Sequence, residues 1–172
     1  MGGIEVPRIY LETTMFSFYY EDRTHGRYQE LKRQVHQVFD RIKAGDYEPY
    51  TSLYTMREID NEKVREKREQ MAALISEYGV KVLDETDEAD QLAALYIQEK
   101  AISPAWETDA AHIAIAAING LDFIVSLNFT HIARPWTVER VRRVNAREGY
   151  KGLGIYKPVE VLESEDDTGI HD

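Results

Sequence analysis

The stretch that decides the fold is TDAAHIAIAAINGLDFIVS, residues 108–126. From Asp109 to Asn119 it is almost wholly apolar, which is typical of a buried helix. Gly120 supplies a favourable helix stop. Residues 122–126 then form a short run rich in Ile, Val and Phe, which indicates a strand. A buried helix that leads directly into a strand indicates a βαβ unit.

The same alternation extends over the rest of the chain. Short segments rich in Ile, Val, Leu and Tyr alternate with longer ones whose apolar residues recur at helical spacing. The predicted strands cover residues 8–11, 50–53, 80–83, 122–126 and 159–162. The predicted helices cover residues 28–42, 57–78, 89–96, 109–119 and 138–144. The pattern predicts an α/β fold with a five-stranded, mostly parallel sheet and helices on both faces.

Length and composition set further bounds. The chain has 172 residues, which suits one domain; we expect it to cover residues 1–163, followed by an acidic flexible tail, 164–172. The absence of cysteine excludes disulfides, thiolate metal ligands and a cysteine nucleophile. No apolar run is long enough for a membrane helix, and the first residues do not read as a secretion signal. We therefore expect a cytoplasmic protein without membrane contact.

The net charge of −10 is unevenly distributed. The last thirteen residues hold six acidic side chains and no Lys or Arg, so residues 1–159 carry a net charge of only −4. Between Arg134 and Lys151 there are five arginines and one lysine against two glutamates. Phosphate binding depends on the local patch more than on the total charge. This stretch is either a solvated helix face or a surface for nucleic acid.

Four polar side chains follow or precede predicted strands in a way that brings them to one edge of the sheet. They are Glu12, Glu58, Asp109 and Asn128. Ligands bind at the carboxyl ends of the strands in such sheets. Each residue also has an ordinary explanation: a loop acid, a salt-bridged helix face, a helix N-terminus or a turn. Their shared location favours a site.

Carboxylates that lie close together repel one another unless a cation neutralises them. Mg²⁺ or Mn²⁺ accepts carboxylate ligands, recruits phosphate and activates water. The cluster therefore predicts a divalent metal on Glu12, Glu58 and Asp109, with phosphodiester hydrolysis as the reaction class. Ser126 lies close by in sequence, as does Thr14.

Two histidines accompany these residues. His112 lies one helical turn after Asp109 and is either a base or metal ligand, or a hydrogen-bonded packing residue. His131 follows Asn128 by three positions, and we expect it to position substrate or support the structure rather than take part directly in the chemistry.

At these residues the sequence resembles the PIN domain family, including VapC-type toxin ribonucleases. RIYLETTMFSFYY, SLYTMREI, TDAAHIAIAAINGLDFIVSLNFTHIAR and IYKPVEVL are similar to its successive motifs. The resemblance runs from about residue 8 to about residue 163. It implies a three-layer α/β/α fold and a Mg²⁺- or Mn²⁺-dependent ribonuclease. It gives Glu12, Glu58, Asp109 and Asn128 the four catalytic positions, and Thr14 that of the small hydroxyl residue in the first turn.

The resemblance also implies partners: an RNA substrate, a small antitoxin in a type II toxin-antitoxin pair, and a second copy of the chain. The candidates for RNA backbone contacts are Arg140, Arg142, Arg143 and Arg147.

The sequence departs from the family at two positions. Glu12 is one methylene longer than the usual Asp, and Asn128 removes a charge where Asp is common. These departures leave open an alternative, a degenerate PIN-like domain that binds nucleic acid or a protein without cleaving it. A nucleotide-binding domain ranks lower, because neither GxGxxG nor GxxxxGK[ST] occurs.

Overall fold

A computed structural model describes residues 5–128 and 134–166. Five strands form one sheet, and all four pairings between neighbouring strands are parallel, in the order β3-β2-β1-β4-β5. The strands are β1 Arg8–Leu11, β2 Glu48–Ser52, β3 Lys81–Leu83, β4 Phe123–Val125 and β5 Gly154–Tyr156. This arrangement confirms the predicted α/β fold with a five-stranded parallel sheet.

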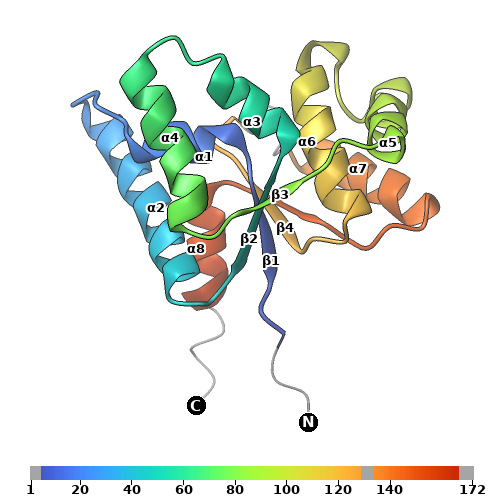
Figure 1. Ribbon diagram of the computed structural model, residues 1–172. Coiled ribbons are helices and arrows are strands. Elements are labelled where there is room, and N and C mark those ends of the chain that lie inside the picture. Colours follow the sequence, from blue (N-terminus) through green and yellow to red (C-terminus); the bar gives the residue numbers. More distant parts are fainter. Residues whose placement is uncertain (1–4, 129–133, 167–172) are drawn as a thin grey trace.

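Helices cover both faces of the sheet (Figure 1). The helices are α1 Thr13–Tyr19, α2 Gly26–Lys43, α3 Leu53–Asp60, α4 Arg65–Glu77, α5 Asp87–Gln98, α6 Glu107–Ile118, α7 Pro135–Arg147 and α8 Pro158–Asp166, with a 3₁₀ turn, η1, at Pro104–Trp106. Figure 1 shows α1, α2, α4 and α8 on one side and α5, α6 and α7 on the other. No helix in the described ranges has the length and apolarity that a membrane span requires.

The alternation of side chains along β1 divides the core into two clusters. Ile9 and Leu11 pack with α1, α2, α4 and α8, whereas Tyr10 packs with α5, α6 and α7. All three side chains are fully buried. Because successive residues of a strand point to opposite faces, the central strand contributes to both layers.

The register of β1 fixes where its chain leaves the sheet. Leu11 is paired with Val125 of β4, and the Glu12 amide donates to the Val125 carbonyl at 3.2 Å. Glu12 and Ser126 therefore emerge side by side at the carboxyl edge of the sheet. Ser52 ends β2 at the same edge.

The prediction of a strand at 159–162 is wrong. These residues lie in α8, and the fifth strand is Gly154–Tyr156. Pro158 begins the helix, where its missing N–H and fixed φ cause no loss. Glu160 Oε1 accepts from the Lys157 amide at 3.0 Å. Two valines suggested a strand, but Val161 instead packs in the cluster beneath α2.

The single helix predicted over 57–78 is two helices, α3 and α4. α3 begins four residues earlier, where Ser52 Oγ accepts from the Tyr54 amide at 3.2 Å. It ends at Asp60, and a short turn precedes Arg65. Helix α1 was not predicted either; Glu12 is its N-cap. As for the expected tail, α8 ends at Asp166 and the residues after it lie outside the described part.

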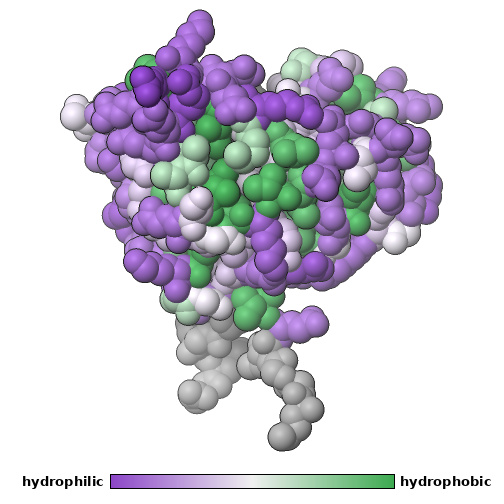
Figure 2. All heavy atoms as spheres, viewed as in Figure 1, coloured by the Kyte–Doolittle hydropathy of each residue, from purple (hydrophilic) through white to green (hydrophobic). Residues whose placement is uncertain are grey.

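The open edge of β3 is short and partly charged. Val82 and Leu53 are 38% and 36% exposed. Figure 2 shows hydrophobic residues gathered near the centre of this face, with hydrophilic residues around them. Lys81 is paired with Glu48 of the neighbouring strand. A three-residue edge with a lysine is a poor template for pairing with another sheet.

The difference in burial between two strand valines predicts the effect of truncating each. Val125 is fully buried, whereas Val82 is 38% exposed. We expect Val125→Ala to lower the free energy of unfolding by about 2 kcal/mol, through lost burial and a residual cavity. Val82→Ala should cost less than half as much. Urea unfolding followed by circular dichroism measures both, and equal losses would contradict the assigned core.

Candidate active site

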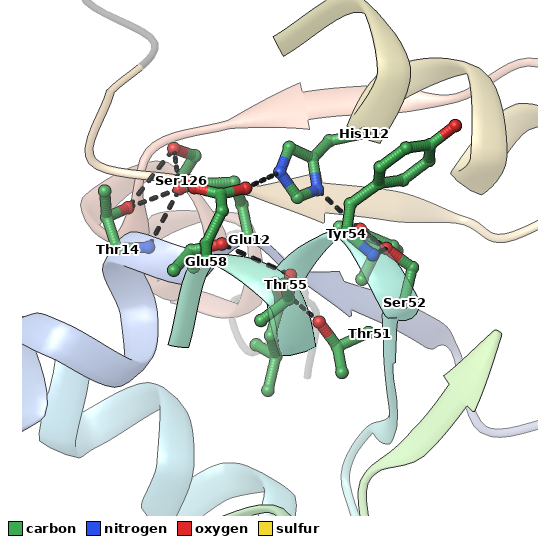
Figure 3. A network of polar contacts seen from close by, with 12 residues as sticks. Glu12, Thr14, Thr51, Ser52, Tyr54, Thr55, Glu58, His112 and Ser126 are labelled. Atoms are coloured by element: carbon green, nitrogen blue, oxygen red, sulfur yellow. Dashed lines mark hydrogen bonds and ion pairs between the residues drawn. The ribbon is translucent and has the colours of Figure 1, made fainter. Parts of the chain in front are cut away.

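Glu12 is a buried carboxylate held by its neighbours. Its side chain is 2% exposed. Oε2 accepts from the Thr14 amide at 3.1 Å, from Thr14 Oγ1 at 2.5 Å and from Ser126 Oγ at 2.5 Å. These groups lie together at the start of α1 and the end of β4 (Figure 3). Two hydroxyls that the sequence only placed nearby therefore fix the orientation of this carboxylate.

The hydroxyl hydrogens have a defined direction. Thr14 Oγ1 accepts from the Leu127 amide, and Ser126 Oγ accepts from the Asn128 amide, each at 2.9 Å. Each hydroxyl therefore uses its own hydrogen for Glu12. Within the described residues, every hydrogen bond to the Glu12 side chain is at Oε2. Oε1 remains for a ligand.

Glu58 and His112 form the second part of the site. Glu58 comes from α3 and His112 from the middle of α6, where it is fully buried. His112 Nε2 lies 2.6 Å from Glu58 Oε1 (Figure 3). The Glu58 side chain is 37% exposed, so it lies between the buried histidine and solvent.

A chain of hydrogen bonds behind His112 fixes its tautomer. His112 Nδ1 lies 2.6 Å from the Tyr10 hydroxyl, which lies 2.6 Å from Ser52 Oγ. Ser52 Oγ already accepts from the Tyr54 amide. Ser52 could accept a second hydrogen bond, so the direction is set at the other end of the chain. The Glu58 carboxylate can only accept, so Nε2–H donates to it. A neutral His112 then accepts at Nδ1 from the Tyr10 hydroxyl, whose oxygen accepts from Ser52. In this arrangement, Nε2 is a donor rather than a metal ligand.

Asp109 faces the same two carboxylates. It lies in the first turn of α6, is partly buried, and is one turn before His112. Burial and the negative charge of Glu12 raise the pKa of Asp109 to about 6; the charge of Glu58 adds to this and His112 partly offsets it. Mutual repulsion of this kind is what a bound cation relieves.

The donor atoms suit a divalent metal. One ligand atom each from Glu12, Glu58 and His112 lies within 4.8 Å of the other two. Asp109 is absent from this tightest group, whereas the sequence favoured it as the third ligand. Because His112 Nε2–H is engaged with Glu58, carboxylate oxygens remain the fitting donors. Hard cations such as Mg²⁺ prefer oxygen ligands and keep several waters.

Among the described residues, the others that the sequence predicted for the site do not belong to this group of ligand atoms. The Asn128 side chain is exposed, and its backbone amide contacts Ser126. His131 lies outside the described residues. The four candidate arginines are exposed on α7. Arg140, Arg143 and Arg147 follow one another at helical spacing, whereas Arg142 is about 160° around the helix from Arg140.

Sequence reasoning missed Tyr10 and Ser52. Tyr10 looks like an ordinary aromatic residue of a buried strand, and Ser52 like a strand end. Their contact depends on β1 and β2 lying side by side, which local spacing does not reveal. A tyrosine and a serine at the ends of adjacent buried strands are the available signal, since buried hydroxyls need partners.

The raised pKa of Asp109 predicts the stability of an Asp109→Asn variant in EDTA. The folded carboxyl holds its proton more tightly than the unfolded one, whose pKa is near 3.8, so wild-type stability falls as pH rises from about 4 to about 6. We expect Asp109→Asn to gain about 1–2 kcal/mol near pH 7.5, allowing for solvent screening. The gain should shrink towards pH 4.

Urea unfolding at about pH 4.5, 6 and 7.5 measures this trend. Asp60→Asn, at an exposed position on α3, is the matched control and should show no such pH dependence. A gain for Asp109→Asn that is the same at all three pH values would contradict the assignment.

The hydrogen-bond direction predicts the tautomer of His112. In metal-free protein near pH 8, ¹⁵N NMR should show Nε2 protonated and Nδ1 unprotonated. Tyr10→Phe removes the donor to Nδ1 and should allow the other tautomer to appear. It should also cost about 1–3 kcal/mol of stability, because buried polar atoms lose a partner. A protonated Nδ1 in the wild-type protein would contradict the proposed chain.

Comparison with known proteins places the fold. No protein-family model matches the sequence, and no curated protein does. A toxin-antitoxin complex from Klebsiella pneumoniae has a TM-score of 0.53 and 16% identity, covering 74% of this chain and 93% of that one. VapBC2 from Rickettsia felis, bound to a DNA fragment from its promoter, has a TM-score of 0.50 and 11% identity, covering 87% and 98%. At these identities the likeness shows the fold alone, and the chain has a PIN-like fold that resembles VapC toxins.

Proposed function

We propose that this protein is a Mg²⁺- or Mn²⁺-dependent endoribonuclease. The observation that carries the proposal is the approach of Glu12 and Glu58, each with a carboxylate oxygen in a group of ligand atoms that lie within 4.8 Å of one another. Their charges also help to raise the pKa of Asp109 to about 6. Such a group of carboxylates is poorly stable without a cation. The fold likeness to toxin-antitoxin proteins supports a nuclease rather than another use of the same chemistry.

The side chains take distinct roles in this proposal. Glu12, Glu58 and Asp109 hold the metal, which when bound supplies an activated water and charge stabilisation for phosphodiester hydrolysis. Thr14 and Ser126 keep Glu12 oriented through Oε2. His112 donates to Glu58 and limits its rotation. Hydrogen bonds that orient the metal ligands in this way govern metal affinity.

The hydrogen bonds of Glu12 also explain how the site accommodates a glutamate where the family usually has an aspartate. Its side chain turns back towards the start of its own helix, where the Thr14 amide binds it. The extra methylene is thereby accommodated at a helix N-terminus, which favours negative charge. The exposed Asn128 contributes no charge, so we propose that one metal, rather than two, binds here.

We also propose the partners that this function requires. The protein would act in the cytoplasm on RNA as the toxin of a type II pair, with a small antitoxin as its inhibitor; the neighbours from Klebsiella pneumoniae and Rickettsia felis are toxin-antitoxin complexes. The exposed apolar side chains of Val82 and Leu53 are candidates for a homodimer surface.

Mn²⁺ titration calorimetry on wild type and Asp109→Asn tests the proposal. We expect binding heat in the wild-type protein and a loss of at least about 10- to 100-fold in affinity in the variant, because a charged ligand is removed. Cleavage of a single-stranded RNA should fall by more than about 100-fold in parallel. Asp60→Asn is the control and should behave as wild type.

Two outcomes would count against this function. RNA cleavage that persists unchanged in Asp109→Asn would overturn the assigned site. No metal binding and no cleavage by the wild-type protein would favour the degenerate, non-cleaving domain, and a protein or nucleic-acid partner would then be sought.

A further inference from the structure

The two tryptophans of the chain line one cavity. The cavity has a volume of about 450 Å³ and lies between η1, the segment after α5 and the first turn of α7. Trp106 is partly buried, and Trp136 is 50% exposed. An exposed tryptophan is unusual on a protein surface, and two that share a cavity suggest a binding site for a flat, apolar group.

A cation lies beside this aromatic surface. The Arg140 guanidinium is 5.1 Å from the centre of the Trp136 ring, one helical turn along α7. Arg140 also donates to the Lys100 carbonyl at 3.1 Å, which fixes the guanidinium between the two segments. A guanidinium held over an indole face provides both stacking surface and positive charge.

A second cavity continues from the first along α7. It has a volume of about 410 Å³, and Lys100 and Arg140 line both. Its other lining residues are Glu99, Arg143, Val144 and Arg147. Four cationic side chains therefore line this groove, and three glutamates contact them: Glu99 in the lining, and Glu139 and Glu148 beside it.

Surface glutamates already contact two of these arginines. Arg143 pairs with Glu139 at 3.2 Å, and Arg147 pairs with Glu99 at 2.8 Å and with Glu148 at 3.2 Å. The side chains in these pairs are between 37% and 76% exposed. Exposed ion pairs of this kind are weak, so a phosphate can displace the glutamates.

Both tryptophans of the cavity lie close in sequence to residues of the acidic site. Trp106 is the N-cap of α6 and comes three residues before Asp109. Trp136 lies in the first turn of α7, the helix that follows β4 and Ser126. In a parallel sheet, the helices between strands begin at the carboxyl edge. The first turns of α6 and α7 therefore lie at the edge that carries the acids.

We propose that this cavity binds an unpaired nucleobase of a single-stranded RNA. The base stacks against Trp136 in the cavity that Trp106 also lines, and the adjoining phosphates lie along the groove formed by Lys100, Arg140, Arg143 and Arg147. An aromatic platform joined to a cationic groove is the combination that single-stranded nucleic acid requires. The inference rests on the proposed ribonuclease function and goes beyond it by assigning a base-binding site outside the acidic cluster.

Intrinsic fluorescence tests the proposal without any cleavage, because both tryptophans belong to the site. Metal-free protein in EDTA is titrated with a ten-nucleotide single-stranded oligoadenylate. We expect quenching on binding, and an affinity about 10- to 100-fold lower in Trp136→Ala, measured with a labelled oligonucleotide. Trp136→Phe should restore most of the affinity, because it keeps a ring to stack on.

Three further measurements test the cationic groove, the position of the aromatic ring and the preference for a single strand. Arg143→Gln should weaken binding and lower the slope of log affinity against log salt by about one. Tyr28→Ala removes a matched aromatic on α2, whose ring lies 3.6 Å from the Arg23 guanidinium, and should bind RNA as the wild type does. A duplex of the same length should show no dependence on Trp136.

Equal affinities of wild type and Trp136→Ala for the oligonucleotide would overturn the proposal. Equally strong quenching by an acidic peptide such as oligoglutamate would also overturn it, and would indicate a protein partner. The two hypotheses separate in this design. Binding that depends on Trp136 without any cleavage would retain the base site and refute the nuclease, whereas cleavage insensitive to Trp136 would do the reverse.

Discussion

The burial of the Glu12 carboxylate is the constraint on which the site depends. A buried carboxylate is costly unless hydrogen bonds and a cation compensate for lost water. Oε2 has three hydrogen bonds, from Thr14 and Ser126. The two from Thr14 are local, whereas the one from Ser126 forms because Leu11 pairs with Val125, which brings Ser126 alongside Glu12. The register of two central strands thus determines where the charge lies and which atom remains for a ligand.

The remaining acids are placed relative to Glu12 by elements on both sides of the sheet edge. α3 begins at the end of β2 and presents Glu58 within one to two turns, while α6 enters with Asp109 and His112 on one face. The Tyr10 hydroxyl ties the sheet to α6 through His112. Tyr10 therefore links the core to the site: its ring packs among α5, α6 and α7, and its hydroxyl is hydrogen-bonded to His112 Nδ1.

Much of the fold and of the acidic cluster could be predicted from spacing. The apolar run from Asp109 to Asn119, followed by Gly120 and a strand, requires no knowledge of distant residues. The segment 159–162 failed because valine content favours a strand, whereas Pro158 and the Glu160 cap determine the outcome. The Tyr10–His112–Glu58 chain was beyond reach, because it joins residues 102 and 54 positions apart. Local patterns predict elements and their order; pairing register decides which polar side chains meet.

The proposed function makes two opposite demands on the charge of one surface. A site that concentrates carboxylates repels the phosphates of its own substrate, so attraction must come from elsewhere on the molecule. The arginines of α7 lie on a helix that follows β4, and therefore start from the edge that carries the acids. A single strand needs an aromatic surface for its bases and positive charge for its phosphates. Arg140 joins the two, since it contacts the Trp136 ring and lines the cationic groove. In this proposal a negatively charged protein holds a polyanion, because the attraction is local and the acidic groups are neutralised where the metal binds.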